Sequence, residues 1–293
     1  MQVAFLYAVV VLIWGSTWAA IPYQLGTVAE EVSVAYRFGL ASLALFAFAA
    51  GTGRRLTIPL RQYVMVVLMG SLMFSANYLF TYYAINHVTS GLVAVVFSLI
   101  VVTNALFERL FFGRPVVRRL VVASILGVVG VACMFWPEVQ RFDLRDESVY
   151  GVFLTIIAVI FASLGNMAAI VSTSRDLPVI TVNAHGMGWG ALTSAIVAIV
   201  LGRKFNFVLQ TDYVASLAYL AIFGSAVAFG CYLALLRSIG SARAAYTSVL
   251  FPVVALIVST LFEGYQWSPP AFAGIVFIAA GNWLALTRME RSD

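Results

Sequence analysis

The sequence predicts an all-α integral membrane protein whose ten transmembrane helices form two inverted five-helix repeats. Three observations lead to this prediction. The 293 residues are 62% hydrophobic and only 10% charged, whereas a soluble domain carries about 25% charged residues. Ten apolar runs are long enough to cross a bilayer, which takes about 20 residues. In addition, one sequence pattern occurs once in each half of the chain.

The apolar runs set the expected spans. Glycine, proline and arginine separate them, as in the turn-forming segment 113–115. A β-barrel is disfavoured because barrel strands alternate apolar and polar residues over about ten positions, whereas these runs are continuously apolar. The first run has no basic segment before it, so we expect a spanning helix rather than a cleaved signal peptide. The expected spans are 3–21, 32–50, 62–85, 90–108, 116–135, 149–171, 180–201, 213–236, 244–262 and 270–287.

The repeated pattern keeps the same internal spacing in both copies. It consists of Gly70-Ser71, Tyr78-Leu79 and Ile85, which return as Gly224-Ser225, Tyr232-Leu233 and Ile239. Because each copy has an odd number of spans, the second copy must enter the membrane in the opposite orientation. We therefore expect a first repeat at 1–136, an external linker at 137–148 and a second repeat at 149–293. Inverted repeats of this kind are typical of secondary transporters.

Basic residues predict the orientation. Most arginines fall in loops on the side of the N-terminus, and cytoplasmic loops are enriched in arginine and lysine. We therefore expect a multi-pass protein of the cell inner membrane with both termini in the cytoplasm. The same loops explain the net charge of +5, so no nucleic acid partner is expected. The two cysteines and two histidines have no suitably spaced partners, so we expect no metal ion and no cofactor.

Short motifs in both repeats resemble those of a known family. They are Trp14-Gly15-Ser16-Thr17-Trp18 in the first span, Arg37-Phe38 with Ala41 in the second, and Glu108 and Glu263 closing the two fourth spans. As an ordered set they resemble the drug/metabolite transporter superfamily, specifically its ten-helix EamA type. Ser98 departs from this pattern, because it stands where the family commonly has a proline. The resemblance implies export of amino acids or other metabolites, with YddG-type aromatic amino acid exporters as the preferred relatives.

A transporter with this architecture should bind its substrate near mid-depth, between the repeats. Polar and aromatic residues are costly there unless they have partners or face water. Tyr78 and Tyr232 are repeat mates, so we expect both to approach the axis that relates the repeats. The candidate substrate-binding residues are Trp14, Thr17, Asn77, Tyr78, Tyr82, Ser98, Ser163, Asn166, Tyr232, Thr247 and Ser248.

Pro252 lies near the middle of the ninth span. Proline lacks the N–H group that would bond to the carbonyl of Ser248, and a freed carbonyl in the membrane needs another partner. We predict a hinge at Pro252, or an acceptor for a substrate ammonium group. A static kink is the alternative.

Charged residues near the spans suggest mainly structural roles. We expect Arg37 to reach outward to water or to pair with Glu30 or Glu31. That would leave no fixed charge at the centre and would favour neutral substrates. Glu108 is expected to cap a helix end, with a gating role as the alternative. No span carries a carboxylate at mid-depth, so proton coupling through a buried acid is not supported.

These observations predict a secondary transporter that exports small neutral metabolites, foremost amino acids including aromatic ones, by alternating access. The alternative is a broad-specificity exporter of drugs or nucleosides. An enzyme is disfavoured because the spans lack clustered Asp, Glu and His residues, and a channel because no charged ring or filter loop is visible. The expected partners are a small-molecule substrate and the lipid bilayer. Small-residue pairs such as Gly186 and Gly190 predict close helix contacts, either internal or in a homodimer.

Overall fold

The computed structural model describes residues 2–26, 28–140, 142, 147–173, 177–262 and 267–286. Glu263 and linker residues 141 and 143–146 lie outside this part of the chain. The α-helices are α1 (Gln2–Ala20), α2 (Glu30–Gly51), α3 (Leu60–Ser71), α4 (Asn77–Ile85), α5 (Ser90–Phe97), α6 (Ile100–Phe112), α7 (Arg118–Met134), α8 (Trp136–Gln140), α9 (Ser148–Ser172), α10 (Val179–Val200), α11 (Thr211–Tyr219), α12 (Ala228–Ile239), α13 (Ser241–Ala244), α14 (Thr247–Phe262) and α15 (Pro269–Leu286).

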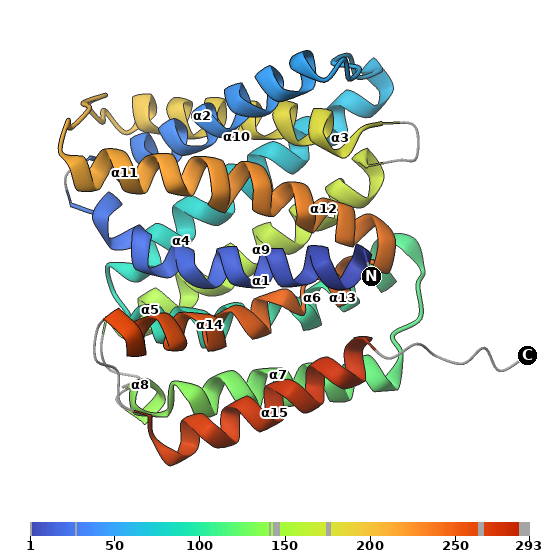
Figure 1. The fold of residues 1–293 in the computed structure, drawn as a ribbon, viewed down its shortest axis with the longest axis vertical. Coiled ribbons are helices and arrows are strands. Elements are labelled where there is room, and N and C mark those ends of the chain that lie inside the picture. Colours follow the sequence, from blue (N-terminus) through green and yellow to red (C-terminus); the bar gives the residue numbers. More distant parts are fainter. Residues whose placement is uncertain are drawn as a thin grey trace, which may run out of the picture.

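Several helices join end to end, so that each predicted span corresponds to one long helical rod (Figure 1). Two rods contain a π-helix in the middle: α3 and α4 join through η2 (Leu72–Ala76), and α11 and α12 join through η3 (Leu220–Val227). A short 3₁₀ helix, η1 (Ile21–Gln24), follows α1. The predicted fold class, an all-α integral membrane protein, is confirmed.

Seven helical stretches in the described residues are long and apolar enough to cross a bilayer on composition alone. The rods built on α1, α7 and α10 fall short of that criterion. The apolar stretch of α1 is shorter, and α7 has 17 residues and begins with Arg118 and Arg119. Helix α10 has 22 residues but includes Asn183 and His185. The bundle shelters Asn183, which is fully buried, while His185 is partly exposed.

The packing of the rods is reciprocal between the two repeats. Helix α2 packs along α10, and α7 packs along α15, so equivalent helices of the two repeats meet. Helix α1 of the first repeat lies against α12 and α14 of the second, while its mate α9 lies against α4 and α6 of the first. Figure 1 shows the α2–α10 and α7–α15 pairs on opposite sides of the bundle. Each contact has a counterpart with the repeats exchanged, as two inverted copies around one axis require.

Glycines allow the closest helix approaches. A Cβ atom on Gly130 of α7 would meet the carbonyl of Gly274 of α15, and one on Gly274 would meet the carbonyl of Gly130. Gly190 of α10 lies equally close to Phe74. The predicted small-residue contacts thus serve the interior of this chain. The homodimer stays a prediction.

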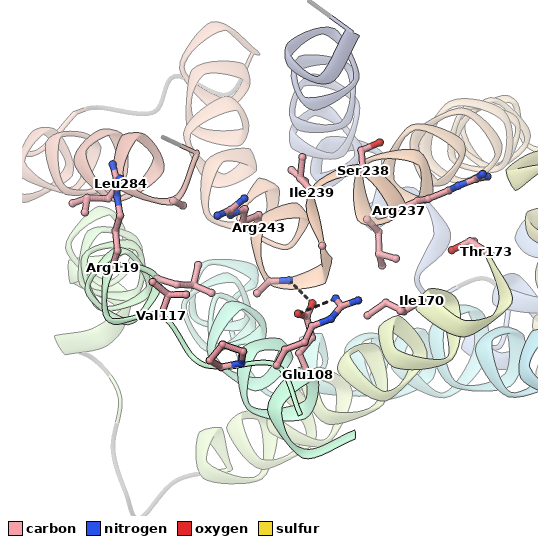
Figure 2. Close-up of a pocket in the computed structure, with 17 residues that line it drawn as sticks. Glu108, Val117, Arg119, Ile170, Thr173, Arg237, Ser238, Ile239, Arg243 and Leu284 are labelled. Carbon is pink, nitrogen blue, oxygen red and sulfur yellow. Dashed lines mark hydrogen bonds and ion pairs between the residues drawn. The ribbon is translucent and has the colours of Figure 1, made fainter. Parts of the chain in front are cut away.

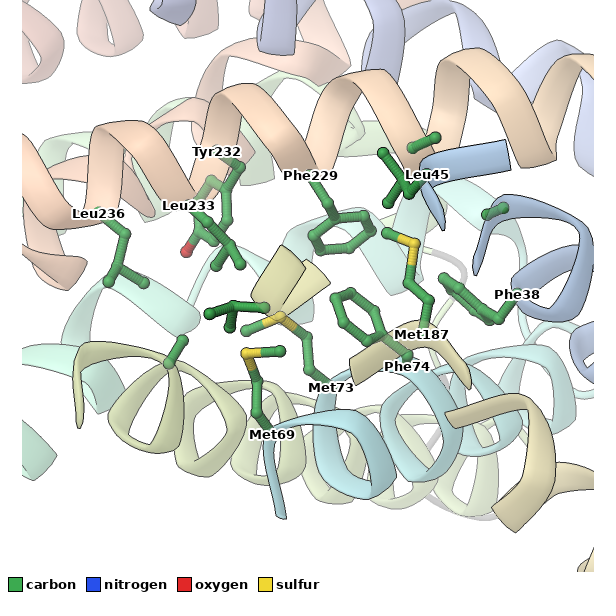
Figure 3. Packing of buried hydrophobic residues seen from close by; sticks show 14 of the residues in the cluster. Phe38, Leu45, Met69, Met73, Phe74, Met187, Phe229, Tyr232, Leu233 and Leu236 are labelled. Atoms are coloured by element: carbon green, nitrogen blue, oxygen red, sulfur yellow. The ribbon is translucent and has the colours of Figure 1, made fainter. Parts of the chain in front are cut away.

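The largest apolar core lies where α2, α3, η2, α10 and α12 meet (Figure 3). Phe74 sits at its centre, with its ring centroid 5.3 Å from Phe38 and 4.8 Å from Phe229. Three methionines, Met69, Met73 and Met187, fill the space around these rings. This cluster holds the helices of the first repeat against those of the second and forms one wall of the central cavity.

Candidate substrate-binding cavity

A cavity of about 120 Å³ lies between the two repeats near the middle of the rods. Helices α1, α2, α4 and α5 line it from the first repeat, and α9, α12 and α14 from the second. Of the predicted site residues, the structure brings Trp14, Thr17, Asn77, Tyr78, Tyr82, Asn166, Tyr232, Thr247 and Ser248 to its wall. Their role in binding stays a prediction, but the structure shows them together.

Ser98 and Ser163 do not line the cavity. Ser98 is buried between α5 and α6, and its hydroxyl donates a hydrogen bond to the carbonyl of Val95 at 2.6 Å. The hydroxyl of Ser163 is hydrogen-bonded to Thr103 at 2.5 Å, which joins α9 to α6. Both hydroxyls therefore satisfy helix contacts. Sequence reasoning did not indicate the direction in which these two side chains point.

Aromatic rings from both repeats form the cavity wall. The ring of Trp14 lies 4.9 Å from Phe229 and 5.1 Å from Tyr232. Phe229 also lies 6.4 Å from Tyr78, so it stands between the two repeat-mate tyrosines. The contacts of Phe229 with Trp14 and Tyr78 are edge-to-face, and such pairs each contribute about 0.5–1.5 kcal/mol beyond area burial. The result is an apolar, well-packed wall on one side of the cavity.

Arg37 lines the cavity, which corrects the expectation of an outward or ion-paired side chain. It is only 2% exposed, and its Nε donates to the hydroxyl of Ser225 at 2.9 Å. Its guanidinium carbon lies 4.8 Å from the ring centre of Tyr78, and its Nη1 has no hydrogen-bond partner. A buried fixed charge at this depth was not expected. The spacing of Val34, Arg37 and Ala41, three and four residues apart, could have placed Arg37 on the inner face of α2.

The acidic residues expected to pair with Arg37 bind elsewhere. Glu31 accepts a hydrogen bond from the hydroxyl of Tyr83 at 2.5 Å and forms an ion pair with Arg203 at 3.4 Å. Glu30 accepts a hydrogen bond from Asn86 at 3.2 Å. These groups lie near the start of α2, just under two turns from Arg37. Thus no acidic residue is among the described residues that line the central cavity with Arg37.

Asn77 provides a second unsatisfied polar group. Its Nδ2 donates to the carbonyl of Met73 at 3.3 Å, while its Oδ1 has no partner, although the residue is only 7% exposed. The hydroxyls of Thr247 and Ser248 bond back to carbonyls of their own chain segment, at 2.8 and 2.6 Å. Pro252 lies inside α14, so it offers no N–H group to the Ser248 carbonyl. Its role as a hinge stays a prediction.

The π-helix η3 positions both Trp14 and Arg37. Trp14 Nε1 donates to the carbonyl of Gly224 at 3.1 Å, and Arg37 bonds to Ser225. Both acceptors belong to the Gly-Ser pair of the sequence repeat. π-helices leave backbone groups free for such contacts and are frequent at functional sites. The repeated Gly-Ser pair was therefore the sequence signal, although sequence reasoning did not predict a π-helix.

A chain of hydrogen bonds leads from the central cavity toward the end of the bundle at which the N-terminus lies. Tyr232 donates to Asn166 at 3.1 Å, Asn166 donates to Asn104 at 3.3 Å, and Asn104 donates to the carbonyl of Ser241 at 3.2 Å. The backbone N–H of Ser241 then donates to Glu108 at 2.8 Å. Asn104 is fully buried, and sequence reasoning did not include it.

A second cavity, of about 580 Å³, opens at this end of the bundle (Figure 2). Arginines dominate its charge: Arg114, Arg119, Arg237 and Arg243 line it beside Glu108. The carboxylate of Glu108 bonds to the start of α13 and pairs with Arg114 at 3.3 Å. Glu108 thus caps a helix end, which agrees with the structural role that we expected and not with the gating alternative alone. Its hydrogen bond to Ser241 also links α6 to α13.

Comparison with known proteins identifies the family. A model described as the EamA-like transporter family matches residues 1–136 and 149–287. The chain belongs to this family. The resemblance deduced from the sequence motifs is therefore confirmed at the level of the family, while the narrower likeness to aromatic amino acid exporters stays a prediction.

Relatives with similar sequences span most of this EamA family member. It is 26% identical over 255 residues to the uncharacterized inner membrane transporter YedA of Escherichia coli (strain K12), covering 86% of this chain and 80% of YedA. It is 20% identical over 285 residues to the protein PagO of Salmonella typhimurium, covering 97% and 93% of the two chains. A solved crystal structure at 18% identity matches 97% of this chain with a TM-score of 0.78, covers 96% of that chain, and supports the fold.

Proposed function

We propose that this EamA family member is a secondary transporter of the cell inner membrane that exports amino acids, including aromatic ones, by alternating access. The central cavity carries the proposal, because polar and aromatic side chains from both repeats converge on it at mid-depth. This is where transporters built from inverted repeats bind substrate. The aromatic wall suits an apolar side chain, and Arg37 and Asn77 offer polar groups for a charged head.

The size of the cavity supports a mechanism that involves movement. Ligand pockets usually have volumes of about 300–1,000 Å³, whereas the central cavity has about 120 Å³. An aromatic amino acid therefore requires the surrounding rods to separate. We propose that the polar chain from Tyr232 to Glu108 closes the path at the arginine-rich end, because it joins α12, α9, α6 and α13 in one network.

A flux measurement tests the proposal. Purified protein in proteoliposomes is loaded with labelled phenylalanine, methionine or threonine, and efflux is followed with and without a pH gradient. We expect efflux of at least one amino acid that is insensitive to the pH gradient. Substitution Tyr78→Ala should lower it about tenfold or more, because it removes the ring that contacts Phe38 at 4.8 Å and lies under Arg37.

The matched control is Tyr23→Ala, which removes a tyrosine that is 55% exposed and lies outside the cavity wall. Its efflux should equal that of the wild type. Absence of efflux for all three amino acids would remove amino acids as the substrate. Drugs and nucleosides would then be the class to test, since the aromatic wall also suits flat apolar molecules.

A further inference from the structure

Two buried polar atoms in the central cavity lack partners, and they are of opposite kinds. Arg37 Nη1 is a charged donor and Asn77 Oδ1 is an acceptor. Their residues are 2% and 7% exposed, and both line the central cavity. Buried polar groups are normally hydrogen-bonded, and an exception calls for an explanation. A bound ligand that accepts from one atom and donates to the other would satisfy both.

The identity of Asn77 Oδ1 as an acceptor follows from its neighbour. The other end of the amide faces the carbonyl of Met73 at 3.3 Å, and only the NH₂ group can donate to a carbonyl. The free end is therefore the oxygen. For Arg37, Nε donates to the hydroxyl of Ser225. Nη1 has no partner and remains available to a ligand. Arginine is suited to a planar carboxylate because its N–H groups match that geometry.

We infer that the central cavity binds the zwitterionic head of an α-amino acid, with its carboxylate on Nη1 of Arg37 and its ammonium group on Oδ1 of Asn77. This inference rests on the proposed function and names the recognition that the function requires. The aromatic wall formed by Trp14, Phe229 and Tyr232 then receives the side chain of the substrate. The positive charge of Arg37 balances the negative charge of the substrate carboxylate.

The charge of the cavity argues against other substrate classes. Arg37 is the one charged side chain among the described residues that line it. A cationic drug would meet an unpaired like charge in a low-dielectric site. A phosphate ester carries up to two negative charges and would normally require more than one cation. An amino acid has no net charge, and its carboxylate gives Arg37 the counter-charge that its surroundings lack.

The first arm of the test uses the wild-type protein and three ligands that share one side chain. Phenylalanine has both head groups, phenylalaninol lacks the carboxylate, and 3-phenylpropionate lacks the ammonium group. We measure competition with labelled phenylalanine efflux, and the thermal shift of the detergent-purified protein. Each analogue should bind at least about tenfold more weakly than phenylalanine, since each loses a hydrogen bond that involves a charged group.

The second arm assigns each contact to its residue. Arg37→Gln should lose the preference for phenylalanine over phenylalaninol and keep the preference over 3-phenylpropionate. Asn77→Leu, which is similar in size, should show the reverse. Arg37→Lys is the matched control that keeps the charge, and it should retain part of the first preference. If a variant does not fold, the wild-type comparison and the other variant still decide.

The outcomes separate the inference from the proposed function. Two results would overturn the inference and leave the export proposal intact. One is equal competition by phenylalanine, phenylalaninol and 3-phenylpropionate. The other is an Arg37→Gln protein that still prefers phenylalanine over phenylalaninol as strongly as the wild type does. Stabilisation by phenylalanine alone, without any efflux, would support the binding site and overturn the transport proposal. If amino acids neither move nor stabilise the wild-type protein, both are wrong.

Discussion

At the scale of single residues, Arg37 is a costly group, because it is charged and only 2% exposed. Placing an arginine at membrane depth costs about 2.5–3.5 kcal/mol by insertion measurements, and simulations give more. Its bond to Ser225 contributes about 1.5–3 kcal/mol, and the face of Tyr78 about 0.5–2 kcal/mol. These contacts hold the side chain in place, yet Nη1 remains without a partner. Such a residue is expected at a binding site and is hard to explain by packing.

Glu108 allows a prediction at the same scale. Its carboxylate accepts hydrogen bonds from the backbone N–H groups of Ser241 and Ala242 at the start of α13. Glu108→Ala should lower the free energy of unfolding by about 1–2 kcal/mol, because these donors lose their cap. Glu108→Gln should cost less, since its amide oxygen can still accept. Thermal unfolding in detergent measures both, and equal stability of wild type and Glu108→Ala would refute the cap.

At the scale of helices, two features shape the bundle. The π-helices interrupt the equivalent rods of both repeats and turn their Gly-Ser pairs toward other helices. In η3 the pair supports Trp14 and Arg37, whereas Ser71, just before η2, bonds to Thr193 of α10 at 2.9 Å. The two repeats therefore share a backbone irregularity and use it differently. One copy builds the cavity and the other builds the α3–α10 contact.

The α7–α15 pair gives the prediction at this scale. Gly274→Ala should destabilise the protein by about 1–3 kcal/mol, because its Cβ would overlap the carbonyl of Gly130 and the side chain of Met134. The matched control is Gly230→Ala on α12, where a Cβ would meet nothing within 4 Å. The control should leave stability unchanged or raise it, since alanine favours a helix.

Thermal unfolding followed by tryptophan fluorescence, with size-exclusion chromatography of the same samples, compares the two alanine variants. A Gly274→Ala protein as stable as Gly230→Ala would show that α7 and α15 do not pack as tightly as the structure indicates.

At the scale of the whole molecule, the two cavities lie along one route. The central cavity holds two unpartnered polar atoms, on Arg37 and Asn77, and the arginine-lined cavity opens at the end where the N-terminus lies. Between them the structure places the chain of hydrogen bonds that includes Asn166 and Asn104. An arginine-lined opening attracts carboxylates from solution. This arrangement suits loading from the arginine-rich side followed by release at the other.

Orientation is the prediction at this scale. Arginines at helix ends favour the cytoplasmic side, so both termini should lie in the cytoplasm. Green fluorescent protein at the C-terminus should fluoresce, and alkaline phosphatase inserted in the exposed loop at 203–207 should be active. Phosphatase inserted in the loop at 53–57 is the matched control on the opposite side and should be inactive. An inactive phosphatase at 203–207 with an active one at 53–57 would place the arginine-lined cavity outside the cytoplasm, and this would contradict the proposed direction of export.

The sequence by itself determined the fold class, the position of most spans and nine of the residues on the cavity wall. It could do so because apolar run length and the spacing of a repeat are local properties of the chain. Tyr78 and Tyr232 occupy equivalent positions in the two repeats, and this equivalence predicted that both would line the cavity. Depth, however, does not give the direction in which a side chain points.

Only the tertiary structure decided the direction of the polar side chains. The rotation of each helix about its axis depends on partners far away in the sequence, so Ser98 and Ser163 turned to helix contacts while Arg37 turned inward. The link through Asn104 needed α6, α9 and α13 to meet. The binding chemistry proposed for the cavity therefore rests on Arg37 and Asn77, whose unpartnered atoms become visible only once the helices are packed.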